Sequence, residues 1–113
     1  MIVAVIDTNV WVSAFLNPAG FPARLVRLGK TGTFLIVSSL PLLEELRPRL
    51  MKIRDVTALD VNAFVASVGA IVRLVPVSGD LRLCRDPDDD VVLETAIRGE
   101  AAYLVSRDED VTR

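Results

Sequence analysis

Histidine is absent from the 113 residues of this chain, and its absence excludes several classes of site at once. A serine–histidine triad, a histidine general base and a zinc site with histidine ligands all require it. Cysteine is almost absent too, since Cys84 is the only one. The chain therefore forms no internal disulfide, and we expect a reducing compartment, namely a bacterial or archaeal cytoplasm.

Long apolar runs are also missing. None approaches the roughly 20 residues that a membrane-spanning helix needs, and the first seven residues lack the pattern of a signal peptide. We expect no contact with a membrane. The formal net charge is only −2, so a nucleic acid would have to bind to local basic patches. The hydrophobic fraction of 51% is high for one small domain spanning residues 1–113, which indicates that part of it forms an interface.

Short apolar runs alternate with amphipathic stretches along the chain. The runs at 2–6, 34–37, 71–75 and 102–105 predict strands, and helices are expected at 10–16, 22–30, from Pro41 to Leu50, at 57–70 and from Pro87 to Arg98. Ser38 and Ser39 are expected to cap the third helix, Pro48 to kink or shorten it, and Gly99 to stop the last helix. This alternation predicts an α/β domain with a parallel sheet of about four strands.

Two acidic residues directly follow predicted strands. Asp7 ends the first strand, and Asp108 follows the fourth. In a parallel sheet both lie at the carboxyl edge, where ligands bind. Each residue alone is more simply a helix cap or a solvated turn residue. Their equivalent places in the topology favour a shared site.

Helix geometry selects Asp89 from its acidic neighbours. At about 100° per residue, Asp89 falls on the same side as Val92 and Ala96, while Asp88 and Asp90 flank it. A carboxylate on the core-facing side is costly to bury unless a partner such as a metal compensates it. The alternative is that these acids merely stabilise the first turn of the helix.

The same geometry favours Glu45 over Glu44. The apolar side of its helix is defined by Leu42, Leu46 and Leu50, and Glu44 points nearly opposite to it. Glu45 lies on the flank of that side. We therefore expect Glu45 to lean toward the carboxyl edge of the sheet and Glu44 to be solvated.

Converging carboxylates need cations, because they cannot all ionise cheaply together. Oxygen ligands favour Mg²⁺ or Mn²⁺. Such ions activate water for phosphodiester hydrolysis, a chemistry that requires neither histidine nor cysteine.

Smaller polar and basic residues stand beside the acids. Thr8 is a candidate to bond a metal ligand or a phosphate. Asn9 either ties the strand end to a neighbouring loop or, as we favour, caps the helix. Ser106 has the same ambiguity. Arg85 and Arg107 are candidates to hold RNA phosphates, although each is equally well an ordinary surface arginine. A more dispersed basic surface is offered by Arg24, Arg27, Lys30, Arg47, Arg49, Lys52 and Arg54.

Four segments, in this order, resemble the motifs of PIN-domain ribonucleases. They are residues 5–15 (VIDTNVWVSAF), 38–46 (SSLPLLEEL), 86–96 (DPDDDVVLETA) and 103–110 (YLVSRDED). Each motif is weak alone, but together they cover nearly the whole chain. Within this family, the segments resemble those of the VapC-like toxins of toxin–antitoxin systems.

This resemblance implies a Rossmann-like three-layer domain, Mg²⁺- or Mn²⁺-dependent cleavage of RNA, an antitoxin partner and a homodimer. It carries the catalytic and metal-binding roles onto Asp7, Glu45, Asp89 and Asp108, with Asp110 as an extra metal ligand. Family members usually continue into a further helix and a last strand. We therefore expect this chain to be truncated at its C-terminus and to lack that strand.

Two other functions remain open on the sequence alone. One is a binding module that holds metal or antitoxin without cleaving RNA. The other is a receiver-type phosphoacceptor domain, which also gathers acids at strand ends. Receivers need a lysine late in the chain, and no lysine follows Lys52.

Overall fold

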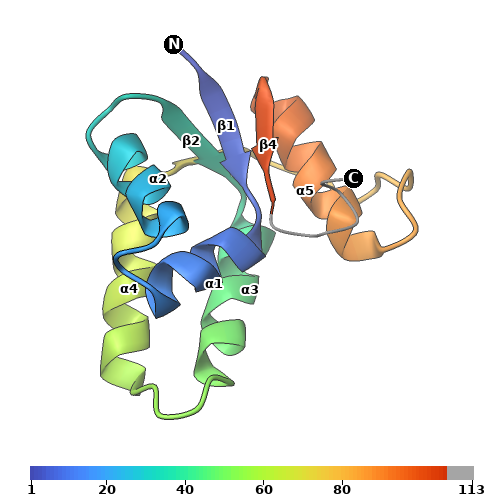
Figure 1. Cartoon of the computed structure of the whole chain (residues 1–113). Helices are drawn as coiled ribbons and strands as arrows, with labels where there is room; N and C mark the ends of the chain where they lie inside the picture. Colours follow the sequence, from blue (N-terminus) through green and yellow to red (C-terminus); the bar gives the residue numbers. More distant parts are fainter. Residues whose placement is uncertain (107–113) are drawn as a thin grey trace.

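The computed structural model describes residues 1–106, with only the backbone included at Pro87 and Asp88 (Figure 1). The strands are β1 (Val3–Ile6), β2 (Leu35–Ser38), β3 (Arg73–Leu74) and β4 (Tyr103–Val105). The helices in this part of the chain are α1 (Thr8–Leu16), α2 (Phe21–Lys30), α3 (Leu40–Met51), α4 (Ala58–Ile71) and α5 (Pro87–Arg98). The expected elements agree with these bounds to within about two residues at each end.

The strands form one parallel sheet in the order β3-β2-β1-β4. Val3 pairs with Leu35 on one side of β1, and Ala4 pairs with Tyr103 on the other. The predicted four-stranded parallel sheet is therefore confirmed. The arrowhead of β1 points toward α1 and α3, so these helices lie at the carboxyl edge of the sheet (Figure 1).

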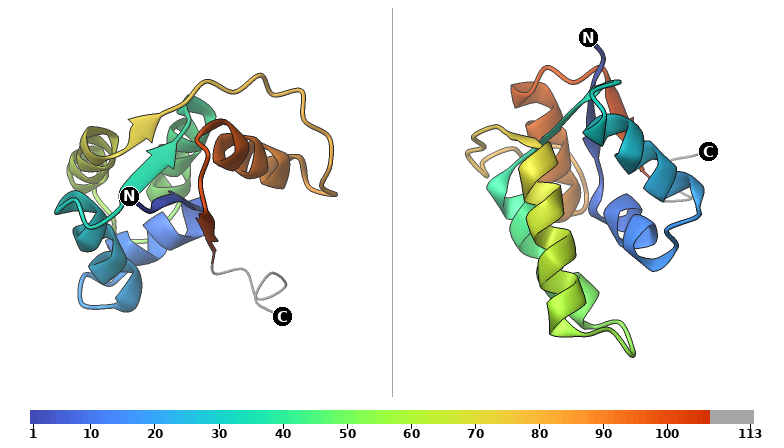
Figure 2. Two further views of the ribbon diagram at one scale, coloured as in Figure 1. Left: turned by 90° about the horizontal axis from the view of Figure 1, so that it is seen from above. Right: turned by 90° about the vertical axis from the view of Figure 1, so that its left-hand side faces the viewer.

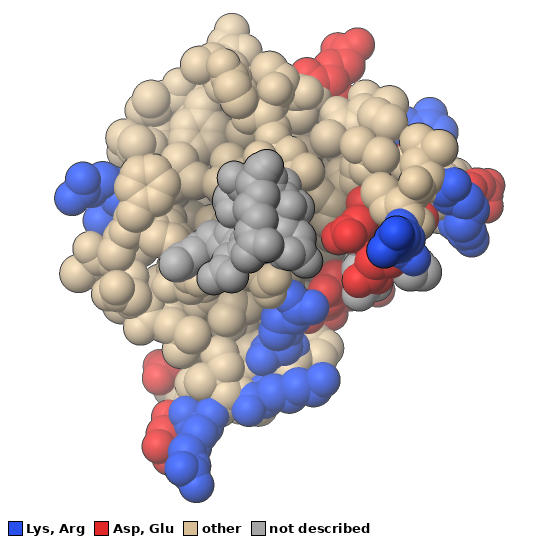
Figure 3. Space-filling model, turned by 45° about the vertical axis from the view of Figure 1, so that its right-hand side comes forward, with Lys and Arg blue, Asp and Glu red and all other residues tan. Residues whose placement is uncertain are grey.

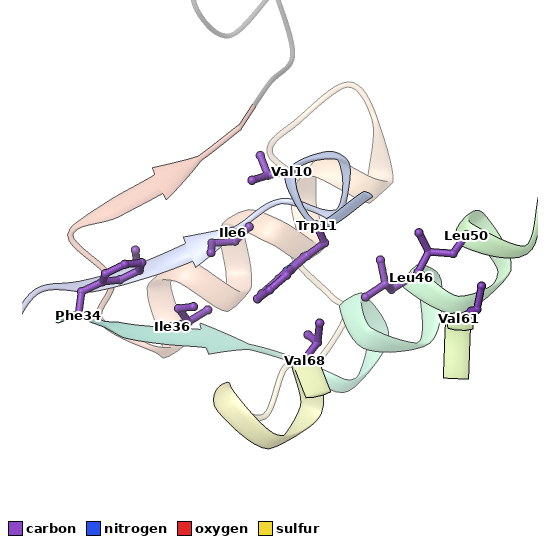
Figure 4. Packing of buried hydrophobic residues seen from close by; sticks show 10 residues of the cluster. Ile6, Val10, Trp11, Phe34, Ile36, Leu46, Leu50, Val61 and Val68 are labelled. Carbon is purple, nitrogen blue, oxygen red and sulfur yellow. The ribbon is translucent and has the colours of Figure 1, made fainter. Parts of the chain in front are cut away.

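Helices cover both faces of the sheet and make three layers, as seen from above in Figure 2. Because successive strand residues point to opposite faces, β1 divides its side chains between two cores. Ala4 and Ile6 pack into the larger one, and Val5 into the smaller one. The residues that the helices add to the larger core include Trp11 on α1, Leu46 and Leu50 on α3, and Val61 and Val68 on α4 (Figure 4). The smaller core is closed by Leu42 on α3 and Val92 on α5.

Pro48 lies inside α3 and does not shorten it, although shortening is one of the two effects that the sequence predicts. The helix continues to Met51. Leu46 and Leu50, which flank the proline, are almost completely buried. Packing of this apolar side outweighs the single intrahelical hydrogen bond that a proline removes.

Helix α5 ends at Arg98, directly before Gly99, as the sequence predicts, but Gly99 is not the residue in the left-handed conformation. The left-handed residue there is Glu100, with φ of 54°. A Cβ on Gly99 would lie 2.8 Å from Cγ2 of Val37 on β2. Gly99 therefore allows the close approach of this turn to the sheet.

None of the helices in the described part of the chain has the length and apolar character needed to cross a membrane.

Replacement of two helical glycines by alanine is expected to change the stability of the protein in opposite directions. A Cβ on Gly29 of α2 would overlap Cδ1 of buried Ile36, whereas a Cβ on Gly69 of α4 meets nothing within 4 Å. Overpacking costs about 1–3 kcal/mol, while alanine gains about 1 kcal/mol over glycine in a helix. Gly69→Ala is expected to raise the free energy of unfolding in urea and Gly29→Ala to lower it. Equal shifts of the same sign would contradict this packing of α2.

Candidate active site

Asp7 lies at the carboxyl edge of the sheet, between the end of β1 and the start of α1. It is the N-cap of α1, and its Oδ1 accepts a hydrogen bond of 2.8 Å from the backbone N–H of Thr8. Its own N–H donates to the carbonyl of Val105 at the end of β4, at 2.9 Å. The half-buried carboxylate is thus fixed beside two strand ends and remains accessible to solvent.

Glu45 lies one turn into α3 and is held by Arg49. Nη2 of Arg49 lies 2.8 Å from Oε1 of Glu45, and its Nη1 donates to Oδ1 of Asn9 on α1 at 2.6 Å. The Glu45 side chain is half-buried, whereas Glu44 is exposed, as helix geometry predicts. This contact connects α3 to the start of α1, two residues after Asp7.

Charged side chains surround a hollow beside this contact. It measures about 500 Å³ and is lined by Glu44, Glu45, Arg49 and Lys52, together with Val91 of α5. On the face shown in Figure 3, acidic and basic side chains gather side by side at the right, and more basic side chains lie along the lower part. Pro41 and Pro48 complete the lining of the hollow, which thus combines charged and apolar side chains.

The first turn of α5 differs from the sequence prediction. Asp89 is exposed, although its helix phase predicts a core-facing carboxylate, and Asp90 is the buried acid, with 3% exposure. The reason is a loop that packs on this helix beside the sheet. The apolar pattern of Val92 and Ala96 carries no information about that loop.

Buried carboxylates hold this loop to α5. Oδ1 of Asp90 accepts from the N–H groups of Leu83 and Cys84, at 2.9 and 2.7 Å. Glu94, one turn later, accepts from the N–H of Ser78 at 2.6 Å and from the N–H of Gly79 at 3.0 Å. These bonds satisfy backbone donors of a loop that has no strand partner.

The same bonds lower the pKa of both carboxyls from their ordinary values. For Asp90 the largest cause is the N–H of Cys84, and for Glu94 it is the N–H of Ser78; burial opposes both shifts. Donors aimed at a carboxylate stabilise its ionised form. Sequence reasoning missed this role, because spacing alone cannot show where a loop returns.

The supporting residues take partly different roles from those expected. Thr8 is buried and reaches Asp7 through its backbone N–H. Asn9 is not the helix cap, because Asp7 takes that place, and Asn9 instead bonds Arg49 of a neighbouring helix. Ser106 lies next to β4, beside a second hollow that Val10 and Phe21 also line. Arg85 is exposed. Arg107, Asp108 and Asp110 lie outside the described residues.

The described carboxylates have the right chemistry for a hard cation but are not gathered around one point. Asp7, Glu45 and Asp89 offer only oxygen donors, which suit Mg²⁺ or Mn²⁺. Among the described side chains, which leave out Asp88 and residues 107–113, no group of three His, Cys, Asp or Glu is arranged to hold a metal. The metal site therefore stays a prediction.

A buried hydroxyl pair joins α3 to α5. Oγ of Ser39 and Oγ1 of Thr95 lie 2.8 Å apart, and Thr95 donates to the carbonyl of Val91. Ser39 must then donate to Thr95. Ser39 occupies the N-cap position of α3 but makes no capping bond with its side chain, contrary to expectation. This pair ties the N-terminus of α3 to the second half of α5.

Two neighbouring serines, Ser38 and Ser39, allow a matched test of the hydrogen bond between Ser39 and Thr95. Ser39→Ala removes a buried hydrogen bond and is expected to lower the free energy of unfolding by about 1 kcal/mol. Ser38 is equally buried, but its Oγ has no hydrogen-bond partner among the described residues. Ser38→Ala is therefore expected to leave stability unchanged or to raise it slightly. Urea unfolding of both variants measures these changes. An equal loss of unfolding free energy in both variants would contradict a stabilising role of the bond between Ser39 and Thr95.

The carboxylates of α5 predict an acid-sensitive loop. Because their pKa values are lowered in the folded protein, they stabilise it fully above the ordinary carboxyl range, and this contribution is lost as the pH falls through the folded pKa. Glu94→Gln is expected to destabilise the protein at pH 7, with a gap to the wild type that narrows as the pH falls below about 4. Glu44→Gln, at an exposed glutamate, is the control. A gap for Glu94→Gln that is independent of pH, measured by urea unfolding, would refute this account.

Comparison with known proteins agrees with this architecture. The family model described as the PIN domain matches residues 3–110. Uncharacterized protein MJ1680 of Methanocaldococcus jannaschii is 29% identical over 114 residues, which covers 95% of this chain and 71% of the relative. No solved structure matches the chain significantly. A family model that spans nearly the whole chain, together with the parallel sheet and its flanking helices, leads to one conclusion: the chain belongs to the PIN domain family.

Proposed function

We propose that this chain is a metal-dependent endoribonuclease and the toxin of a toxin–antitoxin pair. Membership of the family supports a nuclease, because PIN domains are generally hydrolases of this type. The observation that carries the proposal is the placement of Asp7 and Asp89 near the starts of α1 and α5, and of Glu45 in the middle of α3 between them. Helix α3 contacts both of the others at the carboxyl edge of the sheet.

In this proposal Asp7, Glu45, Asp89 and Asp108 hold Mg²⁺ or Mn²⁺, with Asp110 as an additional ligand. The bound metal supplies an activated water and stabilises charge on the leaving oxygen. The protein contributes preorganised carboxylates. The N–H of Thr8 orients Asp7, and the guanidinium of Arg49 orients Glu45. Both carboxylates are accessible to solvent, and so to a substrate.

Asp7→Asn tests this proposal directly. Asparagine caps a helix as well as aspartate does, so the variant should fold while losing a metal-binding charge. Cleavage of a broad RNA pool in Mg²⁺ or Mn²⁺ is expected to fall by about 100-fold or more, since even outer-shell partners of metals contribute 10–100-fold. EDTA should abolish wild-type cleavage.

The control for this variant is Asp60→Asn, at an exposed aspartate in the first turn of α4. It is expected to cleave RNA like the wild type. Growth of cells expressing the wild type or Asp7→Asn tests the toxin role, because only the active protein should arrest growth. If the wild type still cleaves RNA in EDTA, and the Asp7→Asn variant cleaves RNA as fast as the wild type, the metal mechanism is wrong.

A module that binds metal or antitoxin without cleaving RNA is the second candidate, because Glu45 is already paired with Arg49 and Asp90 and Glu94 hold a loop. Calorimetry with Mn²⁺ and the RNA cleavage assay together separate the nuclease from the binding module. Metal binding by a protein that cleaves no RNA favours the binding module. A receiver-type phosphoacceptor is a weaker third candidate. Labelling of Asp7 by a small phosphodonor would support it.

We also propose an antitoxin partner, a homodimer and a cytoplasmic location. Exposed apolar side chains support a protein interface, among them Phe21 at 71% and Leu59 at 79% exposure. Sedimentation of the purified chain measures its oligomeric state, and a monomer at all concentrations would exclude the homodimer.

A further inference from the structure

Arg49, in the last turn of α3, connects the middle of that helix to the first turn of α1 near the proposed site. Its guanidinium bonds Glu45 one turn earlier on α3, and Asn9 on α1, through different terminal nitrogens. A glutamate and an arginine four residues apart on a helix form an ordinary pair that adds little to stability. The bond to Asn9 is different, because it fixes the guanidinium from a second helix.

This guanidinium keeps capacity for a further partner. Arginine carries five N–H donors in a planar fork, and the hydrogen bonds to Asn9 and Glu45 use one donor on each terminal nitrogen. The side chain is 38% exposed and lines the hollow of about 500 Å³ together with Lys52. A cation held in one orientation loses little entropy when it binds an anion.

The surroundings of Arg49 favour an anion with spaced charges. Lys52 adds a second cation to the same hollow, while Glu44 and Glu45 on its wall would repel an isolated anionic side chain. A nucleic acid backbone, by contrast, presents one phosphate after another and can place one on the cations and the next near the carboxylates. Arginine forks match phosphate geometry with two parallel hydrogen bonds.

We infer that Arg49 binds a backbone phosphate of single-stranded RNA beside the carboxylates, with Asn9 as the residue that positions its guanidinium. This inference rests on the proposed function and deepens it, because it states where the substrate crosses the protein. The RNA then runs over the hollow between α3 and the start of α5. Among the basic residues, sequence alone gives Arg49 no special place.

A binding measurement without turnover tests this inference. Fluorescence anisotropy of a short fluorescein-labelled single-stranded RNA in EDTA gives Kd over a range of salt concentrations. Arg49→Gln is expected to raise Kd about 10-fold, as loss of a charged hydrogen bond does. The slope of log K against log salt should fall by about 0.7, which corresponds to one phosphate contact on a single strand.

Arg47→Gln is the matched control. Arg47 lies on the same helix and also bonds an asparagine, since its Nε donates to Oδ1 of Asn62 at 2.8 Å, but it does not line the hollow. Arg47→Gln is expected to bind RNA like the wild type. Arg49→Lys keeps the charge and loses the fork, so it should keep the salt slope and raise Kd by less than Arg49→Gln. It also serves if Arg49→Gln fails to fold, as judged by circular dichroism.

The outcomes separate this inference from the proposed function. Equal Kd and salt slope for Arg49→Gln and Arg47→Gln, or no RNA binding by the wild type, would overturn the role of Arg49, even in a protein that cleaves RNA. Binding that depends on Arg49 in a protein that never cleaves RNA would support the inference and reject the nuclease. Where cleavage occurs, Arg49→Gln should raise KM more than it lowers kcat.

Discussion

Strand β1 pairs in parallel with β2 on one side and with β4 on the other, and helices cover both of its faces. Everything else about the candidate site depends on this pairing. Parallel neighbours cannot be joined by tight turns, so each connection needs a crossover that returns to the opposite edge. The carboxyl ends of β1 and β4 therefore lie side by side, and the N–H of Asp7 donates a hydrogen bond to the carbonyl of Val105 there. The same constraint brings α1 and α3 together at the carboxyl edge.

The acids of this chain fall into groups with different physical roles. Asp90 and Glu94 are buried and accept backbone N–H bonds from the loop beside α5. Their charge is compensated within the protein, so their role is structural. Asp7, Glu45 and Asp89 are wholly or partly exposed, with Asp7 and Asp89 at helix starts and Glu45 in the middle of α3 beside Arg49. A cation from solution can reach these carboxylates, which is why the proposed chemistry is assigned to them.

Arg49 places a positive charge beside these solvent-accessible acids. A cation that orients Glu45 and also meets a phosphate would bring the negatively charged substrate to a negatively charged edge. An arginine held in a fixed geometry binds a phosphate more strongly and more directionally than dispersed basic side chains do. With a net charge of only −2 and no large basic face expected, such local placement is how this protein would hold RNA.

The fold was largely predictable from sequence, because its signals are local. The β-branched run at 2–6 and the Asp86-Pro87 helix start depend only on neighbouring residues, and both match the structure. Gly99 and Pro48 were harder, since the space beside Val37 and the burial of Leu46 and Leu50 arise from distant segments.

The candidate site divides in the same way. Its position at the ends of parallel strands, and the half-burial of Glu45 beside exposed Glu44, followed from strand order and helix period. The burial of Asp90 in place of Asp89, and the bond between Asn9 and Arg49, did not. Periodicity reports which side of one element is apolar. Only tertiary structure decides which polar group from elsewhere in the chain arrives to satisfy a given side chain.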